Sequence, residues 1–464
     1  MSEERAGLTA EEERPASMTP AEVMRLAQER ETSLSRLLVA YISTGLIFML
    51  LPGTFLGVWN LLQISGRQSI LLVSAAWLQA HGHAQVFGWI GSFILGIGFY
   101  SVPKLRVSKK PAFWAAWTCW AMWTVGVAMR WFANIYEFHW RVLLPFSAAL
   151  ELVAFLIFLR AVSRHRPGDA GKTRLEPWVW VVISASLGLL LSLLANLAAC
   201  AYLSAIGRSP ALSHVLDQRY IVLITWGFMV PFVWGFSSRW MPVFLGLKAV
   251  RFRLLFGALA VNFAGVVMSL VGWEAQATAL FVAAALLAIA ALRIFEAAVQ
   301  EPKTRGVHRS FPFFVRMAYA WLLAASLLGV AAALWDRAGG IWGASRHALT
   351  VGFIAVMVLC IGQRILPAFA GMRRLWSTRL MFAGLFLLAV GCILRVSNEV
   401  LAYESYANWA WSVLPASAFL ELAGITAFAL NIFGTFILEP AHFYKEAVVL
   451  PSGGKPSGRP VQNA

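Results

Sequence analysis

Histidines at matched positions in long apolar runs are the residues of this sequence best suited to chemistry. His83 and His347 each precede a glycine by five residues and a proline by twenty. An ionisable side chain within an apolar helix is costly and usually faces the bundle interior or a water-filled cavity. Imidazole is also the commonest metal ligand. Two such histidines on facing helices, at one depth, predict the axial ligands of a heme iron.

Two further histidines extend this candidate set. His81 lies two residues before His83, on nearly the opposite side of an ideal helix. We expect one of the pair to be a ligand, and the other a second metal ligand, an entry-loop residue or a propionate partner. His139 precedes a later apolar run and is a candidate third ligand. The plainer alternative for each is an interfacial, hydrogen-bonded histidine.

Charged residues recur in the same pattern. Arg130 and Arg395 follow the two matched prolines by 27 and 28 residues. Arginine binds carboxylates bidentately, which predicts contacts to heme propionates or other anions, with snorkelling to the interface as the alternative. Glu151 and Glu421 close the matched stretches "LPFSAALEL" and "LPASAFLEL". These carboxyl groups predict either a proton relay or hydrogen bonds between helices.

The composition is that of a polytopic membrane protein. Of 464 residues, 59% are hydrophobic and 13% are charged, whereas soluble domains carry about 25% charged residues. The apolar runs are long and continuous, as membrane-spanning helices require. Although the net charge is +16, the basic residues lie in short loops, so nucleic-acid binding is not expected. The four cysteines form no CxxC pair and are expected to be buried apolar residues.

Twelve spans are predicted, and the basic residues orient them. The loops after every second span hold most of the Lys and Arg residues, which places both termini in the cytoplasm of a bacterial inner membrane. We predict a cytoplasmic N-terminal tail (1–36), a membrane domain (37–437) and a cytoplasmic C-terminal tail (438–464). The remaining histidines and two arginines are expected in loops or at the interface: His165, His214, His308, His442, Arg239 and Arg364. The predicted spans are 37–64, 81–103, 111–133, 140–162, 177–206, 217–246, 251–272, 275–299, 311–335, 345–369, 377–402 and 408–437.

The matched stretches indicate three repeats of four helices, over 37–162, 177–299 and 311–437. The middle copy is fainter: "SRWMP" corresponds to "QRILP", and Val222 stands where the other copies have histidine. The predicted fold is therefore an all-α bundle with threefold pseudosymmetry, in which spans 2, 6 and 10 are equivalent.

The segments "HGHAQVFGW" and "RHALTVGF", together with the repeat, resemble the NnrS family and, more distantly, the catalytic subunit of heme-copper oxidases and nitric oxide reductases. The resemblance implies a fold like oxidase subunit I, heme, copper, and a role in nitric oxide metabolism or nitrosative stress. In the oxidases, helices 2 and 10 carry the two histidines of a low-spin heme, as His83 and His347 are placed here. The further heme ligand and the copper-ligating histidines of the oxidases have no counterpart in these spans, so any copper would need a different ligand set.

The sequence thus predicts a membrane protein that binds heme, of b type, in nitric oxide metabolism or electron transfer. It leaves open whether the protein is an oxidoreductase acting on nitric oxide. An electron donor would be external, because no CxxCH site is present. The alternatives are a multi-pass transporter or channel, and a non-catalytic subunit or assembly factor of a respiratory complex.

Overall fold

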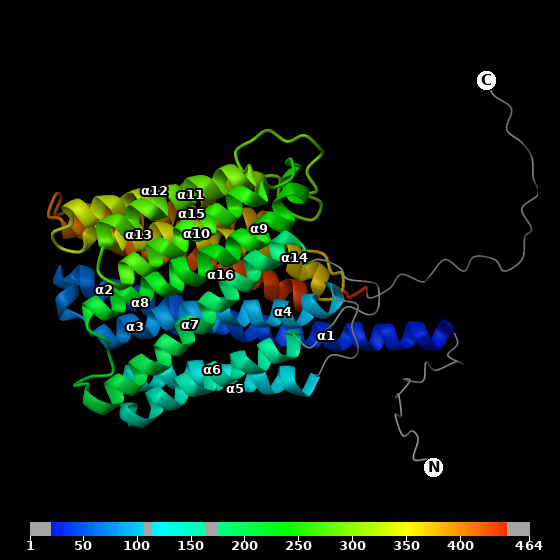
Figure 1. The fold of residues 1–464 in the computed structure, drawn as a ribbon, viewed down its shortest axis with the longest axis horizontal. Coiled ribbons are helices and arrows are strands. Elements are labelled where there is room, and N and C mark those ends of the chain that lie inside the picture. Colours follow the sequence, from blue (N-terminus) through cyan, green and yellow to red (C-terminus); the bar gives the residue numbers. More distant parts are fainter. Residues whose placement is uncertain (1–19, 106–112, 164–174, 443–464) are drawn as a thin grey trace, which may run out of the picture.

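The fold is a bundle of long helices packed side by side (Figure 1). The computed structural model describes residues 20–105, 113–163 and 175–442, and within these ranges it contains helices and no strand. The helices are α1 (Pro20–Phe48), η1 (Met49–Phe55), α2 (Leu56–Arg67), η2 (Ile70–Leu72), α3 (Ala75–His83), η3 (Ala84–Gly91), α4 (Ser92–Leu105), α5 (Phe113–Tyr136), α6 (Trp140–Ser163), α7 (Pro177–Ile206), α8 (His214–Ile224), η4 (Thr225–Met229), α9 (Val230–Leu245), α10 (Phe252–Leu270), α11 (Glu274–Leu292), α12 (Phe311–Trp335), α13 (Gly340–His347), η5 (Ala348–Ala355), α14 (Val356–Phe369), α15 (Thr378–Tyr403) and α16 (Ala410–Ile437).

Eleven helices of the described chain are long and apolar enough to cross a membrane, so this is a multi-pass membrane protein. Two of them, Pro177–Ile206 and Phe311–Trp335, match the predicted ranges to the residue. The predicted span at 111–133 is helix α5, which has 24 residues but is not among the eleven. Five tryptophans, Arg130 and Asn134 lower its mean hydropathy below that of the other spans.

The first span begins earlier than the sequence suggested. Helix α1 starts at Pro20, inside the segment predicted as a tail, and continues through η1 and α2 to Arg67. Residues 1–19 and 443–464, which hold the ends of the predicted tails, lie outside the described residues. The basic loop segments 106–112 and 164–174, including His165, also lie outside them.

Four of the spanning helices contain a π-helical segment. These are η1 in the first span, η3 after His83, η4 in the span that carries Val222, and η5 after His347. A π turn closes its hydrogen bonds one residue further along than an α turn, and such turns are frequent at functional sites. The last three segments fall at corresponding points of the spans predicted to be equivalent.

Close helix packing depends on small residues at the crossings. Gly188 of α7 lies against the backbone of Gly227 in η4, where a Cβ atom would overlap the carbonyl oxygen of Gly227. In lipid, such close approach supplies much of the attraction between helices. Large side chains such as Trp123 and Trp234 fill the interior, and the Trp123 indole donates to the carbonyl oxygen of Phe87 at 3.0 Å.

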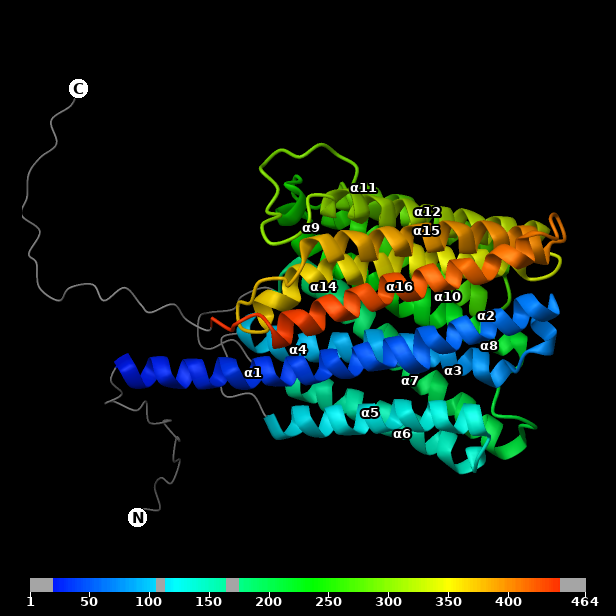
Figure 2. The same cartoon turned by 180° about the vertical axis from the view of Figure 1, so that it is seen from behind.

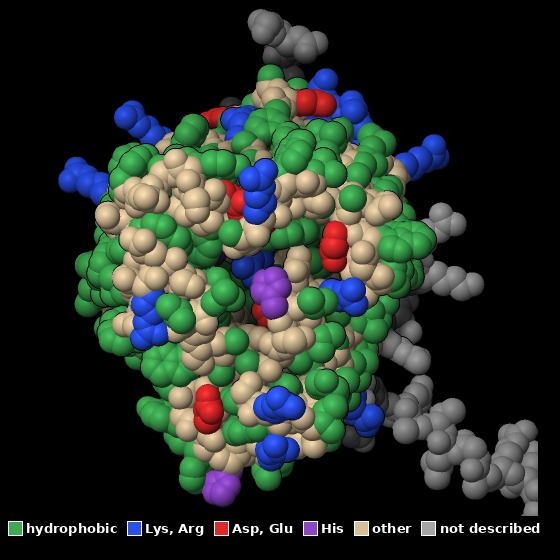
Figure 3. Space-filling model, turned by 90° about the vertical axis from the view of Figure 1, so that its left-hand side faces the viewer, with side chains coloured by type: hydrophobic (Ala, Val, Ile, Leu, Met, Phe, Trp, Pro, Cys, Tyr) green, Lys and Arg blue, Asp and Glu red, His purple; other side chains and the backbone are tan. Residues whose placement is uncertain are grey.

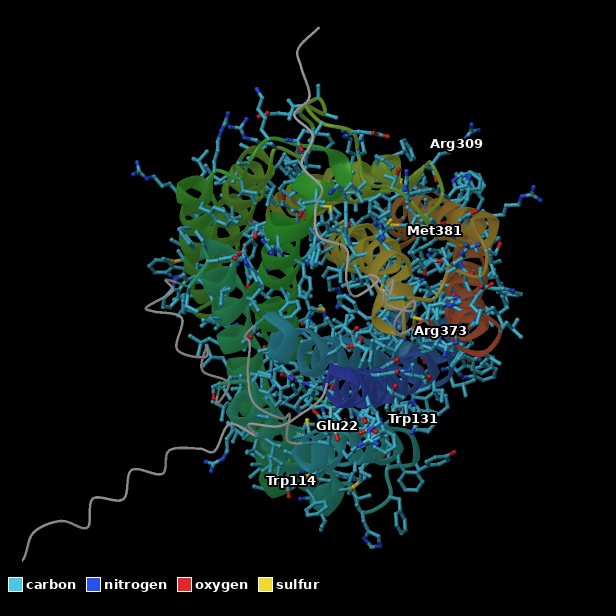
Figure 4. All side chains as sticks on the ribbon, turned by 90° about the vertical axis from the view of Figure 1, so that its right-hand side faces the viewer. Glu22, Trp114, Trp131, Arg309, Arg373 and Met381 are labelled. Carbon is cyan, nitrogen blue, oxygen red and sulfur yellow. The ribbon has the colours of Figure 1, made fainter. Side chains whose placement is uncertain are left out.

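The start of α1 and the end of α16 lie at the same end of the bundle, and α1 runs beside α4 (Figures 1 and 2). Figure 4 looks onto this end, with Glu22 near the start of α1 and with Arg309 and Arg373, two of the basic loop residues that the orientation argument used. The starts of α3, α8 and α13 lie at the opposite end (Figure 1). Helices α3 and α13 carry the candidate histidines at their last turns.

Candidate functional site

Two clusters of buried and partly buried polar residues occupy the half of the bundle near the starts of α3, α8 and α13. Figure 3 looks onto this end and shows a histidine beside a hollow, with basic side chains around it. We name the clusters after their histidines. The His83 cluster contains His83, Arg130, Glu151, Asn196 and Cys200, and the His347 cluster contains His347, Arg395, Glu399 and Glu421.

The His83 cluster is built around a buried histidine–carboxylate pair. His83 Nε2 lies 2.8 Å from Glu151 Oε1, and both side chains are buried. The amide of Asn196 on α7 donates to the other carboxylate oxygen at 3.5 Å. The His83 ring also packs on Phe87, one turn along, with ring centroids 4.7 Å apart. Glu151 is thus held from two helices, and its carboxylate fixes the orientation of the imidazole.

Arg130 of α5 is buried beside this pair. Its Nη1 donates to the thiol sulfur of Cys200, which in turn lies 3.7 Å from Asn196 Oδ1. The Nε atom of Arg130 is buried and has no hydrogen-bond partner among the described residues. A thiol is a weak acceptor, so the guanidinium is poorly satisfied where it stands.

The His347 cluster holds its histidine by the other ring nitrogen. His347 Nδ1 lies 2.9 Å from the carbonyl oxygen of Gly343 and 2.8 Å from Glu399 Oε2. Arg395 Nη2 lies 3.4 Å from His347 Nε2, and Arg395 Nε lies 3.5 Å from Glu399. Since a guanidinium can only donate, Nε2 is the acceptor and Nδ1 carries the proton. Gly343 is required here, because a Cβ atom would collide with the Glu399 carboxylate.

His81 faces η1 and α2 rather than the His83–Glu151 pair. Its Nδ1 donates to the carbonyl oxygen of Gly53 in η1 at 2.8 Å, which leaves Nε2 as the acceptor atom. His347 and Arg395 are close enough to act on His81 electrostatically. A Cβ atom on Gly57 would come within 2.6 Å of the His81 ring, so this glycine makes room for the imidazole.

The carboxylates of the two clusters sit in matching surroundings. A Cβ atom on Gly126 would lie 2.9 Å from Glu151 Cγ and 3.0 Å from the carbonyl oxygen of Ser147. Gly391 has the same relation to Glu421, with a Cγ at 2.8 Å and the carbonyl oxygen of Ser417 at 3.0 Å. In each case a glycine on one helix lets the glutamate of the next helix pack against its backbone.

The middle third of the chain has an apolar version of this contact. There a Cβ atom on Gly265 would lie 2.7 Å from the ring of Phe281, which takes the place that glutamate has in the other two contacts. Phe281 stacks on Trp226, with centroids 4.4 Å apart and an interplanar angle of 6°. A small cavity of about 20 Å³ adjoins these rings and Val222. Phe281 and Val222 thus stand in place of a carboxylate and a histidine, and the ionisable group that lines the cavity is Glu274.

The other candidate residues lie apart from these clusters. His139 is an exposed residue with φ 41° in the turn between α5 and α6, where its ring contacts Phe138. His308 lies 2.7 Å from Ser310, and the backbone N–H of His442 donates to the carbonyl oxygen of Gly371. Arg239 is paired with Glu176 at 3.3 Å, and Arg364 lies over the ring of Phe244.

The structure thus redistributes the predicted histidines. The repeat alignment joined His83 with His347, whereas in the structure His83 lies on Glu151, His347 lies on Glu399, and His81 is held by the backbone of η1. Sequence reasoning did not single out Glu399 or Asn196. Glu399 could have been found, because it follows Arg395 by four residues on the same helix face. Asn196 is a single polar residue in an apolar run and gave no such signal.

No group of three or more His, Cys, Asp or Glu side chains with the spacing of a metal site occurs in the described part of the chain. A heme needs only two axial ligands, so this finding does not bear on heme. The four cysteines are free and buried.

Comparison with known proteins gives a match to a family model that carries no assigned function. The family model described as "Domain of unknown function (DUF8744)" matches residues 238–432. The match runs from the end of α9 into α16, so it covers the His347 cluster and ends before the chain's C-terminal segment. A search of curated proteins found no match.

Proposed function

We propose that this chain is a heme-binding integral membrane protein in which His81 and His347 are the axial ligands. The observation that supports the proposal is that both imidazole rings have the same hydrogen-bonding arrangement. Each Nδ1 is bound to a backbone carbonyl oxygen, of Gly53 and of Gly343, and each Nε2 is left as a lone-pair donor. Metal-ligating histidines are usually oriented in this way, by a bond from the ring nitrogen that does not bind the metal.

The residues around these two rings fit such a group. Gly57 makes room for the His81 ring, and Gly343 makes room for the Glu399 carboxylate that pairs with His347. Arg395 now faces His347 Nε2, and on ligation it would turn to a propionate, which a guanidinium binds well. In contrast, the Nε2 atom of His83 is bound to Glu151. We therefore favour His81 over His83 as the partner of His347 in holding heme. Bound heme would supply one-electron redox chemistry at this position.

The proposed class of fold follows from the matched contacts. The Gly–Glu pairs of the first and last thirds, the Gly–Phe pair of the middle third, and the three π segments support three pseudo-repeats arranged as in oxidase subunit I. The NnrS-like segments add a role in nitric oxide metabolism or membrane electron transfer, with nitric oxide as ligand and an external electron donor. We also propose b-type heme, the bacterial inner membrane and cytoplasmic termini, whereas copper lacks support from any ligand set.

The test is the absorption spectrum of the purified protein, with a pyridine hemochrome assay and metal analysis. The wild-type protein should show a Soret band. His81→Ala and His347→Ala should each remove or strongly shift it. The exposed His139→Ala is the matched control and should retain it. His83→Ala, which loses the stabilising pair with Glu151, should retain the band in the protein that folds. A protein without heme, or a band lost in His83→Ala and kept in His81→Ala, would contradict the proposed ligands.

A transporter is the second candidate, favoured by buried charge clusters beside π-helical segments in several spans. A colourless protein that moves a solute across proteoliposomes would establish it in place of the heme protein.

A further inference from the structure

Arg130 is a buried cation whose natural partner is missing. The residue is 4% exposed, its Nη1 donates to the Cys200 thiol, and its Nε has no partner. No carboxylate lies within ion-pair distance of it among the described residues. Burying a charge without a partner is expensive, and proteins rarely do so without a functional reason.

The equivalent arginine shows what Arg130 lacks. Arg395 is followed four residues later by Glu399, and the two form an ion pair at 3.5 Å. Arg130 is followed four residues later by Asn134, whose amide donates to the backbone carbonyl oxygens of Ala76 and Pro210. The first third of the chain thus keeps the buried guanidinium and replaces its carboxylate by a neutral amide.

The remaining charges nearby do not supply the missing anion. Glu151 is held by His83 and Asn196, and Asp217 on α8 lies in the fields of Arg346 and His214 as well as of Arg130. Tyr220, also on α8, has a buried hydroxyl group with no partner and interacts electrostatically with Arg130. Arg130 Nε and the Tyr220 hydroxyl are thus both buried donors without a partner among the described residues, and Tyr220 lies within electrostatic range of Arg130.

The loop 207–213 closes this region toward the nearest end of the bundle. Gln79 binds the backbone of Leu212 through both its amide oxygen and its amide nitrogen, at 2.9 and 3.0 Å. Asn134 binds the carbonyl oxygen of Pro210 at 3.0 Å. The two side chains fasten the loop to α3 and to the part of α5 that follows Arg130, so the loop covers this part of the bundle.

We propose that Arg130 is the centre of a binding site for a small, planar, monovalent oxyanion of the carboxylate type, separate from the heme site. The anion would take the place that Glu399 occupies beside Arg395, with two oxygens on the Nε edge of the guanidinium and a further bond from Tyr220. A planar oxyanion matches the forked geometry of arginine, which a spherical anion does not. The site lies with His83, on the side of α3 away from His81, and does not depend on heme.

The experiment measures binding of formate to the detergent-purified full-length protein, by calorimetry and by the ligand-dependent rise of the unfolding temperature. Wild-type protein should bind formate in preference to chloride at equal ionic strength. Arg130→Lys, which keeps the charge and loses the fork, should weaken binding at least about tenfold. Arg208→Lys, in the exposed part of the loop, is the matched control and should bind as wild type does.

Two further variants keep the proposal testable if Arg130→Lys folds poorly. Tyr220→Phe should weaken formate binding by a few fold without loss of the fold. Asn134→Glu restores the carboxylate of the equivalent position and should abolish formate binding by occupying Arg130 internally. Equal binding by the wild type, Tyr220→Phe and Asn134→Glu, or equal affinity for chloride, would overturn the proposal. Repeating the titration on His81→Ala separates this outcome from any failure of heme binding, since formate binding should persist in that variant.

Discussion

Gly57 is predicted to control the position of His81, and replacing it tests the proposed ligand directly. In Gly57→Ala the added methyl group would stand 2.6 Å from His81 Cε1 and 2.9 Å from Nδ1. An ordinary contact between such atoms is about 3.5–4.0 Å, so the ring must retreat by about 1 Å. That movement would stretch the 2.8 Å bond from Nδ1 to Gly53 beyond hydrogen-bonding distance.

The cost follows from these two changes. Overpacking in a well-packed region costs about 1–3 kcal/mol of stability. The loss of one hydrogen bond costs about 1 kcal/mol, which is part of this range. We therefore expect Gly57→Ala to lower the free energy of unfolding by about 1–3 kcal/mol. We also expect a lower heme content or a shifted Soret band, because the imidazole loses the bond that orients it.

The assay compares thermal unfolding and absorption spectra of three variants in the same detergent. Gly66→Ala on α2 and Gly82→Ala on α3 are the controls, because an added Cβ atom at either position meets nothing within 4 Å. Gly82 is adjacent to His81, so its variant controls for helix stiffening beside the same ring. If Gly57→Ala unfolds and absorbs as Gly66→Ala does, the tight seating of His81 against η1 is refuted.

Two other perturbations test the packing and the His83 cluster. Gly188→Ala should destabilise the protein by about 3 kcal/mol or more, because its methyl group meets the rigid backbone of Gly227. The control, Gly257→Ala, places its methyl group in open space and should be neutral. Equal unfolding temperatures of the two variants would contradict the close crossing of α7 and η4. Glu151→Leu and His83→Leu should each lower the free energy of unfolding by about 3–5 kcal/mol, because each leaves a buried partner unpaired. The double variant should lose clearly less stability than the sum of the two single variants. Additive losses in this double-mutant cycle would show that the pair does not interact.

The sequence was sufficient to predict the helices, because a span in lipid must be a continuous apolar helix. The ends of most spans fall within a few residues of the prediction, and the exceptions have physical reasons. Helix α1 begins at Pro20 because residues with high helix propensity extend the span beyond its apolar part. Helix α5 has a lower mean hydropathy than the other spans because it carries Arg130 and Asn134, which are buried in the interior of the bundle.

The sequence indicated which residues lie in the two clusters, but it did not indicate which histidine pairs with which carboxylate. Repeat spacing drew attention to His83, His347, Glu151 and Glu421, and all four lie in the two clusters. Which imidazole meets which carboxylate depends on the rotation of each helix, and spacing along the chain does not contain that rotation. The histidine of the last third takes Glu399, from the neighbouring helix α15, whereas the histidine of the first third takes Glu151 from α6.

The π-helical segments set the rotation of the span ends that carry His83, Val222 and His347 relative to the rest of each span. Each residue of an α-helix turns the chain by about 100°, and a π turn accommodates one residue more than an α turn does. Deleting a single residue from η3 would therefore restore regular α geometry and rotate His81 and His83 by about a quarter turn relative to α4. A change of one residue in length at these points would turn both histidines toward new neighbours, while the apolar faces at the other end of the span stayed where they are. A chain built in this way can acquire a new arrangement of polar groups by insertion or deletion, without changing a residue of the site itself.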